Sequence, residues 1–315
     1  MGKTAFLFAG QGAQNVGMGK DIVEAIPEAA EIFSMGEEIR TGITGICFGQ
    51  GSESDGALLG RTINTQPALF LTDLAIAVSL RAAGIVPDAV AGFSLGEIPA
   101  AAFAGVLSYE EAFRLVLLRG ESMDWQSALH PGGVAAVLKL DAPTVERLCA
   151  DLCEVWPVNY NCPGQISCAG KAESIDALCT AAKAAGGRAV RLPVSGAFHT
   201  PYMQKVAPIL RAFLDAAEVC APAVALYANR TGMPYPADRD GITECLTKQV
   251  CSPVRWEDTL RRMWEDGIDT FVEVGAGHTL TGFVNRTLPE ACALTVNDVD
   301  TLKTVVARMR NGGGA

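Results

Sequence analysis

The chain carries a Gly-x-Ser-x-Gly pattern within Ala91-Gly92-Phe93-Ser94-Leu95-Gly96-Glu97. The apolar run 85–91 has the composition of a buried strand, and the Ala-rich run 98–104 favours a helix. Between a strand and a helix this pattern predicts a nucleophile elbow, because its glycines permit a sharp turn that exposes the serine hydroxyl. A chain of this length contains such a pattern by chance with a probability of roughly 0.1. The prediction therefore depends on the flanking strand and helix.

Strand-like and helix-like segments alternate along the rest of the first half. Residues 4–8 and 85–91 read as strands, and residues 67–82 and 109–127 as helices. This alternation favours an α/β architecture with a largely parallel sheet. We therefore predict an α/β-hydrolase-like main domain in which the strand before Ser94 delivers it to an edge of the sheet.

The middle of the chain has a different order of predicted elements, β-α-β-β-α-β. The expected elements are strand 134–140, helix 141–153 with Asp141 as its N-cap, short strands around Tyr160 and Ile166, helix 174–185 and strand 188–193. This order is typical of a ferredoxin-like module. We predict that residues 129–196 form an inserted subdomain, which divides the main domain into residues 1–128 and 197–315. The last third should contain helix 200–217, strand 223–228, helix 256–266 and strand 270–274.

Composition excludes several classes of function. The formal net charge of −10 disfavours nucleic-acid binding, which needs clustered Lys and Arg. The ten cysteines and three histidines show no metal-ligand spacing, so we expect no metal and no disulfide. There is no signal-like N-terminus and no uncharged apolar run long enough to span a bilayer. We expect a cytoplasmic protein that binds neither nucleic acid nor membrane.

A serine nucleophile needs a base, and the chain has only His130, His199 and His278. His199 lies in a loop of small residues where the inserted subdomain should rejoin the main domain. His278 directly follows a predicted strand, where a hydrolase places its histidine. The residues alone leave both as candidates, and a serine esterase or thioesterase that uses Ser94 and His278 is one possible enzyme.

Six motifs in a fixed order add a resemblance that covers nearly the whole chain. They are Phe8-Ala9-Gly10-Gln11-Gly12-Ala13-Gln14, the elbow at Ser94, Arg119 with Met123, Asn161-Cys162-Pro163-Gly164-Gln165, Gly196-Ala197-Phe198-His199, and Gln249-Val250-Cys251-Ser252-Pro253-Val254-Arg255-Trp256. Together they resemble the malonyl-CoA:acyl carrier protein transacylase family. They are also similar to the acyltransferase domains of polyketide synthases.

The resemblance implies a catalytic mechanism. Ser94 would attack the malonyl thioester and His199 would act as the base. A main-chain carbonyl near Gln249 would orient the histidine in place of a carboxylate. The backbone N–H groups of Gln11 and Leu95 would form the oxyanion hole.

The resemblance also implies the substrates and the residues that bind them. Arg119 would pair with the free carboxylate of malonate, and Met123, Asn161 and Phe198 would contact the substrate. From the sequence alone, it is equally possible that Arg119 lies at the helix edge and reaches solvent or a structural Glu. The acyl donor would be malonyl-CoA and the acceptor acyl carrier protein, with no cofactor, in fatty acid synthesis. A trans-acting polyketide acyltransferase is the alternative.

Two positions depart from the family pattern. Phe93 stands where the family usually has His, and Gly275-Ala276-Gly277 replaces the usual Gly-Pro-Gly. Because acyl carrier protein is acidic, a local basic surface would have to receive it. The candidates for such a surface are Lys183, Arg188, Arg191 and Lys205. The alternative is that these four residues are unrelated solvated charges.

Overall fold

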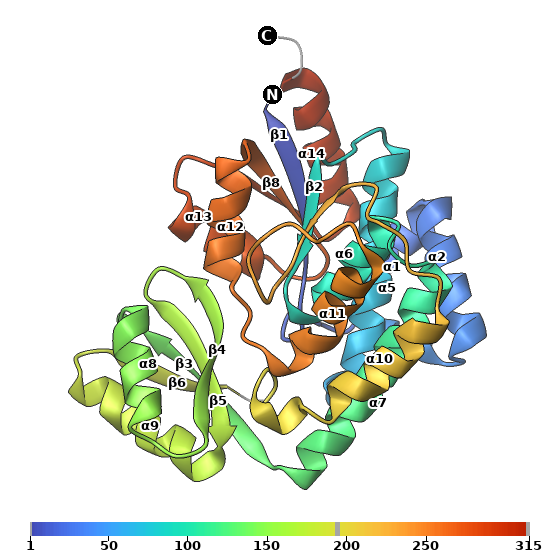
Figure 1. The fold of residues 1–315 in the computed structure, drawn as a ribbon. Coiled ribbons are helices and arrows are strands. Elements are labelled where there is room, and N and C mark those ends of the chain that lie inside the picture. The colour runs from blue at the N-terminus through green and yellow to red at the C-terminus, as the bar shows by residue number, and fades with distance from the viewer. Residues whose placement is uncertain (1, 193–195, 313–315) are drawn as a thin grey trace.

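A five-stranded parallel sheet forms the centre of the larger part of the molecule (Figure 1). The computed structural model describes residues 2–192 and 196–312. The sheet order is β7 (Ala225–Tyr227), β2 (Ala89–Gly92), β1 (Lys3–Phe8), β8 (Ile268–Val274) and β9 (Cys292–Val296). All adjacent pairs are parallel, which confirms the predicted sheet. The carboxyl ends of the strands therefore meet at one edge, where open α/β sheets bind their ligands.

Helices cover both faces of this sheet (Figure 1). Their bounds are α1 (Lys20–Ala25), α2 (Pro27–Ile39), α3 (Ile43–Phe48), α4 (Asp55–Leu59), α5 (Thr62–Ala82), α6 (Glu97–Phe103), α7 (Tyr109–Leu129), α10 (Val206–Ala216), α11 (Arg239–Lys248), α12 (Trp256–Glu265), α13 (Thr279–Thr287) and α14 (Val299–Gly312). In length and hydropathy α5 could cross a membrane, but 94% of its most apolar window is buried inside the protein. It is the central core helix.

Three elements differ from their predicted bounds for identifiable reasons. Helix α5 begins five residues before Pro67, because the guanidinium of Arg40 replaces the missing N–H of Pro67 by donating to the carbonyl of Ile63 at 2.6 Å. The predicted helix 200–217 is a short 3₁₀ turn followed by α10. The predicted strand 85–91 is shortened to β2, which begins after Pro87 and Asp88.

A separate four-stranded antiparallel sheet forms a smaller unit, at the lower left in Figure 1. Its elements are β3 (Gly132–Leu138), α8 (Ala142–Ala150), β4 (Val155–Cys162), β5 (Gln165–Lys171), α9 (Ala172–Ala184) and β6 (Arg188–Leu192). The strand order β4-β5-β3-β6 confirms the ferredoxin-like arrangement. Asp141 caps α8 by accepting from the backbone N–H of Thr144, as predicted. The end of the predicted insertion 129–196 includes residues 193–195, which lie outside the described part of the chain.

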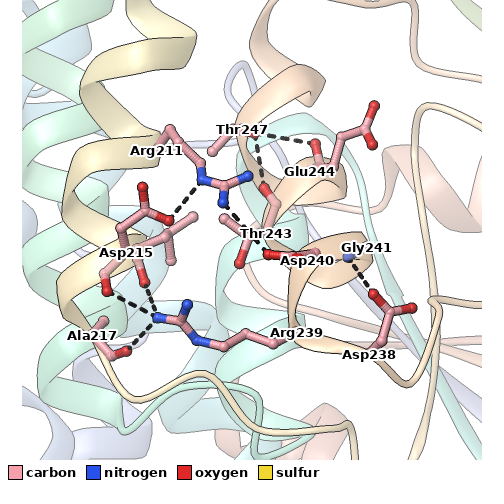
Figure 2. Close-up of polar contacts among 11 residues, drawn as sticks. Arg211, Asp215, Ala217, Asp238, Arg239, Asp240, Gly241, Thr243, Glu244 and Thr247 are labelled. Atoms are coloured by element: carbon pink, nitrogen blue, oxygen red, sulfur yellow. Dashed lines mark hydrogen bonds and ion pairs between the residues drawn. The ribbon is translucent and has the colours of Figure 1, made fainter.

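Polar contacts join α10 to α11, the helix that leads to Gln249 (Figure 2). One nitrogen of Arg239 donates to the carbonyls of Leu214, Asp215 and Ala217 at 2.9 to 3.2 Å. These are carbonyls at the end of α10, which the helix itself leaves unsatisfied. Arg239 therefore fixes the position of the segment that carries Gln249 relative to the helix that follows His199.

Replacing Arg239 with alanine should lower the free energy of unfolding by about 1 kcal/mol, because charged donors to helix-terminal carbonyls are lost. Arg261→Ala is a matched control, since the one described partner of Arg261 is Glu257, one turn away on the surface of α12. That control should change stability by less than about 0.5 kcal/mol. Urea denaturation measures both variants, and equal losses would contradict a specific role for Arg239.

Candidate active site

Ser94 occupies a strained turn between β2 and α6. Its φ of 53° lies in the left-handed region, which residues other than glycine rarely adopt. The flanking glycines have no room for a side chain. A Cβ on Gly92 would lie 1.9 Å from the backbone of Gly96, and one on Gly96 would lie 2.3 Å from the carbonyl oxygen of Phe8. The turn therefore has the geometry of a nucleophile elbow.

His199 lies within hydrogen-bond distance of the serine. Ser94 Oγ is 2.7 Å from His199 Nε2. The other ring nitrogen, Nδ1, is 3.0 Å from the carbonyl oxygen of Gln249 and 3.1 Å from that of Ser252. Because carbonyl oxygens only accept hydrogen bonds, Nδ1 carries the proton in the neutral ring and Nε2 presents its lone pair to Ser94. Among the described residues, backbone carbonyls orient the imidazole in place of a carboxylate.

Burial keeps this imidazole neutral. His199 is 5% exposed, and its burial together with the charge of Arg119 lowers its pKa to about 4. Burial also lowers the pKa of Arg119 to about 10, against the opposing influence of Glu97. At neutral pH the site therefore contains a neutral base and a positive charge.

Arg119 lies on the buried face of α7 and has neutral partners. Its guanidinium donates to the side-chain oxygens of Gln66 at 2.8 Å and Gln249 at 2.9 Å, and it lies 3.4 Å from Ser94 Oγ. Within the described residues no carboxylate is within 4.0 Å of it, and its Nε has no partner. A buried cation of this kind is costly unless an anion joins it. The arrangement suits a ligand with a carboxylate next to the group that Ser94 attacks.

Two backbone N–H groups are available near the serine. Gln11 follows β1 and Leu95 follows Ser94, and β1 and β2 are neighbours in the sheet. Among the residues that the structure describes, neither N–H donates to a protein group. The side chain of Gln11 donates to Thr62 Oγ1 at 3.3 Å, which anchors the first loop. This pair of donors fits an oxyanion hole.

A cavity of about 500 Å³ extends from the elbow region to the small subdomain. Gln11, Phe93, Phe198 and Asn161 line it, and all four come from segments that the resemblance singled out. Asn161 donates to Ser167 Oγ at 3.2 Å, and its side-chain oxygen has no partner among the described residues, so it can accept from a ligand. Met123 is buried and accepts a weak contact from Gln66, but it is absent from the described lining of the cavity.

The other residues that the sequence singled out lie away from Ser94 Oγ or serve in packing. His278 is exposed at the start of α13 and makes no hydrogen bond to Ser94 in the described structure. Phe93 packs edge-on against Trp256, with ring centroids 5.4 Å apart. Gly275, with a φ of 123°, packs so closely on the buried carboxyl of Asp73 that a Cβ would lie 2.0 Å from it. Within the described residues, no three His, Cys, Asp or Glu side chains converge as a metal site.

Sequence reasoning missed two residues at this site. Gln66 is fully buried within α5 and contacts Arg119. Asn229 is fully buried just beyond β7, and its side chain contacts the elbow. Their positions in the sequence could have indicated both residues. Gln66 is an amide inside an apolar helix, and Asn229 is an amide at the carboxyl end of a parallel strand.

The comparisons with known proteins agree with this geometry. The acyl transferase domain family model matches residues 5–315. The chain is 35% identical over 316 residues to the malonyl CoA-acyl carrier protein transacylase of Bacillus subtilis, covering 98% of each chain. A solved transacylase of that name from Clostridium perfringens superposes with a TM-score of 0.93 at 34% identity, covering 99% of this chain and 98% of the other. A chain of the complex between a type II PKS acyl-carrier protein and its malonyl-transacylase gives a TM-score of 0.92 at 32% identity, with 97% and 99% covered. The chain belongs to the acyl transferase domain family and is an acyltransferase.

Proposed function

We propose that this enzyme transfers a malonyl group from malonyl-CoA to the phosphopantetheine thiol of acyl carrier protein, through a malonyl-serine intermediate at Ser94. The observation that carries the proposal is the buried guanidinium of Arg119, which has no carboxylate partner among the described residues and lies 3.4 Å from Ser94 Oγ. The malonyl-specific names of the similar proteins support the same substrate. Mass analysis of carrier protein incubated with enzyme and malonyl-CoA tests it, and an unmodified carrier protein would contradict it.

The first half-reaction forms the acyl-enzyme. As Ser94 Oγ attacks the thioester carbonyl, His199 Nε2 accepts the hydroxyl proton. The negative charge that develops on the carbonyl oxygen is stabilised by the N–H groups of Gln11 and Leu95. When the carbon–sulfur bond breaks, His199 returns the proton to the thiolate of CoA, which leaves as the free thiol.

The second half-reaction reverses these roles. His199 removes the proton from the carrier-protein thiol, and the thiolate attacks the malonyl-serine ester in the same oxyanion hole. The serine oxygen leaves and recovers its proton from His199. Arg119 holds the malonyl carboxylate in both halves, so the acyl group stays in place while the thiols exchange.

The pathway and the surroundings of the site complete the proposal. We propose fatty acid synthesis as the destination of the malonyl group. The alternative is a polyketide pathway, which the similarity to the transacylase of a type II PKS complex supports. Residues 1–128 and 197–315 form the catalytic domain, and residues 129–196 form the inserted subdomain. The enzyme acts in the cytoplasm without a cofactor.

Basic residues of the small subdomain and of the segment before α10 are the proposed docking surface for the carrier protein. Lys183, Arg188 and Lys205 are exposed, and Arg191 is exposed but forms an ion pair with Asp176. Arg188 and Arg191 lie on β6, the edge strand of the small sheet. An exposed basic edge would attract an acidic carrier.

Replacing both Arg188 and Arg191 with glutamate should raise the KM for carrier protein about tenfold or more, because the docking surface changes sign. Acylation by malonyl-CoA should change much less, and it serves as the internal control. Steady-state transfer at low ionic strength measures both. Unchanged carrier-protein kinetics would remove this surface from the proposal.

Phe198 should favour malonyl over methylmalonyl, because its ring occupies the space that an α-methyl group needs. Phe198→Ala should raise the ratio of kcat/KM for methylmalonyl-CoA to that for malonyl-CoA by about 10- to 200-fold, the usual value of one methyl group in a pocket. Phe213→Ala is the matched control, since Phe213 packs on the core from α10 and does not line the cavity. An unchanged ratio in Phe198→Ala would contradict this role.

His199 should remain neutral across the working pH range. With its pKa lowered to about 4, the imidazole should be the active base at pH 5, where an ordinary histidine would be mostly protonated. NMR titration can resolve the three histidine rings, and the pKa of His199 should rise toward 6.5 in Arg119→Ala because a positive neighbour is removed. A pKa at or above 6.5 in the wild-type enzyme would contradict this account.

A further inference from the structure

Asn229 lies outside the Gly-x-Ser-x-Gly motif, but its side chain hydrogen-bonds to the backbone of the nucleophile elbow. Asn229 is completely buried and follows β7, the strand beside β2. Its Oδ1 accepts from the backbone N–H of Ser94 at 2.7 Å, and its Nδ2 donates to the carbonyl of Gly92 at 2.5 Å. We propose that Asn229 is a positioning residue that holds the elbow in the conformation needed for acylation of Ser94. This inference rests on the proposed function, because it assigns a role in the same reaction.

The elbow needs such a restraint because of its backbone conformation. Ser94 has a φ of 53°, and strained residues of this kind persist only where the surroundings fix them. Asn229 binds two backbone groups directly before the Cα of Ser94, the carbonyl of Gly92 and the N–H of Ser94 itself, which lie on either side of Phe93. A single planar amide therefore sets the distance between these two groups and keeps both satisfied in a buried turn.

The orientation of the Asn229 amide follows from its partners. A backbone N–H only donates and a carbonyl only accepts, so the oxygen of the amide must face Ser94 and its nitrogen must face Gly92. The backbone of Asn229 is fixed as well. Its N–H donates to Glu97 Oε1 at 3.1 Å, and that same oxygen accepts from the hydroxyl of Tyr235 at 2.7 Å. Glu97 and Tyr235 are both buried, so the whole support is shielded from water.

This arrangement also divides the N–H groups of the elbow between two tasks. The N–H of Ser94 is occupied by Asn229, whereas the N–H of Leu95 donates to no described protein group. Only the N–H of Leu95 is therefore available to the oxyanion from this turn. Loss of Asn229 should change the chemical step at Ser94 and leave the contact between Arg119 and the malonyl carboxylate intact.

The experiment measures acylation and binding separately in Asn229→Ala and Asn229→Asp. Aspartate keeps the shape and the acceptor for Ser94 but replaces the donor to Gly92 with an oxygen. Rapid-quench mass spectrometry should show that the acylation rate constant falls by about 100-fold or more. In a Ser94→Ala background, the Kd for malonyl-CoA should change by less than threefold. The matched control is Asn285→Ala, which removes an exposed amide on α13 that has no described hydrogen bond and should leave acylation unchanged.

Several outcomes would overturn the role of Asn229. Acylation within threefold of wild type would do so, and so would a Kd that weakens in proportion to the lost rate. If both Asn229 variants fail to fold, Tyr235→Phe provides the test, because it loosens the same support. Its acylation rate should then fall about three- to tenfold at constant Kd, and an unchanged rate would overturn the proposal. A fluorophosphonate probe, run in parallel, separates the two claims: a wild-type enzyme that reacts with the probe but not with malonyl-CoA contradicts only the proposed function.

Discussion

Replacing His199 with alanine should lower the rate of malonyl transfer by about 10⁴- to 10⁶-fold, the loss typical when the base of a serine nucleophile is removed. The reason is geometric. Ser94 Oγ has one basic neighbour, His199 Nε2 at 2.7 Å, and no other base is within hydrogen-bond distance in the described structure. A serine hydroxyl without a base is a weak nucleophile at neutral pH. The measurement is the single-turnover rate of acylation by malonyl-CoA.

His278→Ala is the control for this experiment, because it tests the esterase or thioesterase that the sequence left open. His278 is exposed at the residue before α13, so its removal should leave the rate within about threefold of wild type. A large loss in His278→Ala together with a small loss in His199→Ala would reverse the assignment of the base. That result would favour the serine esterase or thioesterase that uses Ser94 and His278.

Arg119→Ala should lower kcat/KM for malonyl-CoA by about 10² to 10³-fold or more. Truncation of one partner in a buried ion pair typically costs 3–5 kcal/mol. The same substitution should have little effect on acetyl-CoA, which has no carboxylate, so the preference for malonyl-CoA should nearly disappear. Arg119→Lys should recover only part of the activity, because a single ammonium cannot reproduce the bidentate hydrogen bonds of a guanidinium to a carboxylate. Steady-state kinetics with both thioesters measures the change in preference.

Arg114→Ala is the matched control for Arg119, because Arg114 lies on the same helix but faces solvent. It should leave both substrates unaffected. Equal losses for malonyl-CoA and acetyl-CoA in Arg119→Ala would contradict a carboxylate-binding role. They would indicate instead that Arg119 mainly supports Gln66 and Gln249, its two amide partners.

The parts of the fold that depend on local pattern were predictable. The elbow at Ser94 follows from two glycines placed between a strand-like and a helix-like run, and the ferredoxin-like unit follows from the order of its short elements. The stretch between residues 228 and 256 is rich in Gly, Pro and Asp, which is typical of a loop, yet it contains helix α11. In the structure Asp238 caps it by accepting from the N–H of Gly241 at 2.8 Å, and Arg239 ties it to α10. Such tertiary contacts have no signature in local composition.

The site was predictable only in part, for the same reason. Nothing in the residues distinguished His199 from His278, because the choice depends on which loop the chain brings to Ser94. Gln66 and Asn229 belong to no motif that we used, yet both contact the central residues. Their roles arise from burial next to a charge and next to a strained turn, which only the folded chain creates.

Intact-protein mass spectrometry after brief mixing with malonyl-CoA tests the central claim most directly. The enzyme should gain one malonyl group, and acyl carrier protein should remove it. Ser94→Ala should gain nothing, and Arg119→Ala should gain much less. An adduct that survives in Ser94→Ala, or an enzyme that forms no adduct with malonyl-CoA, would contradict a malonyl-serine intermediate.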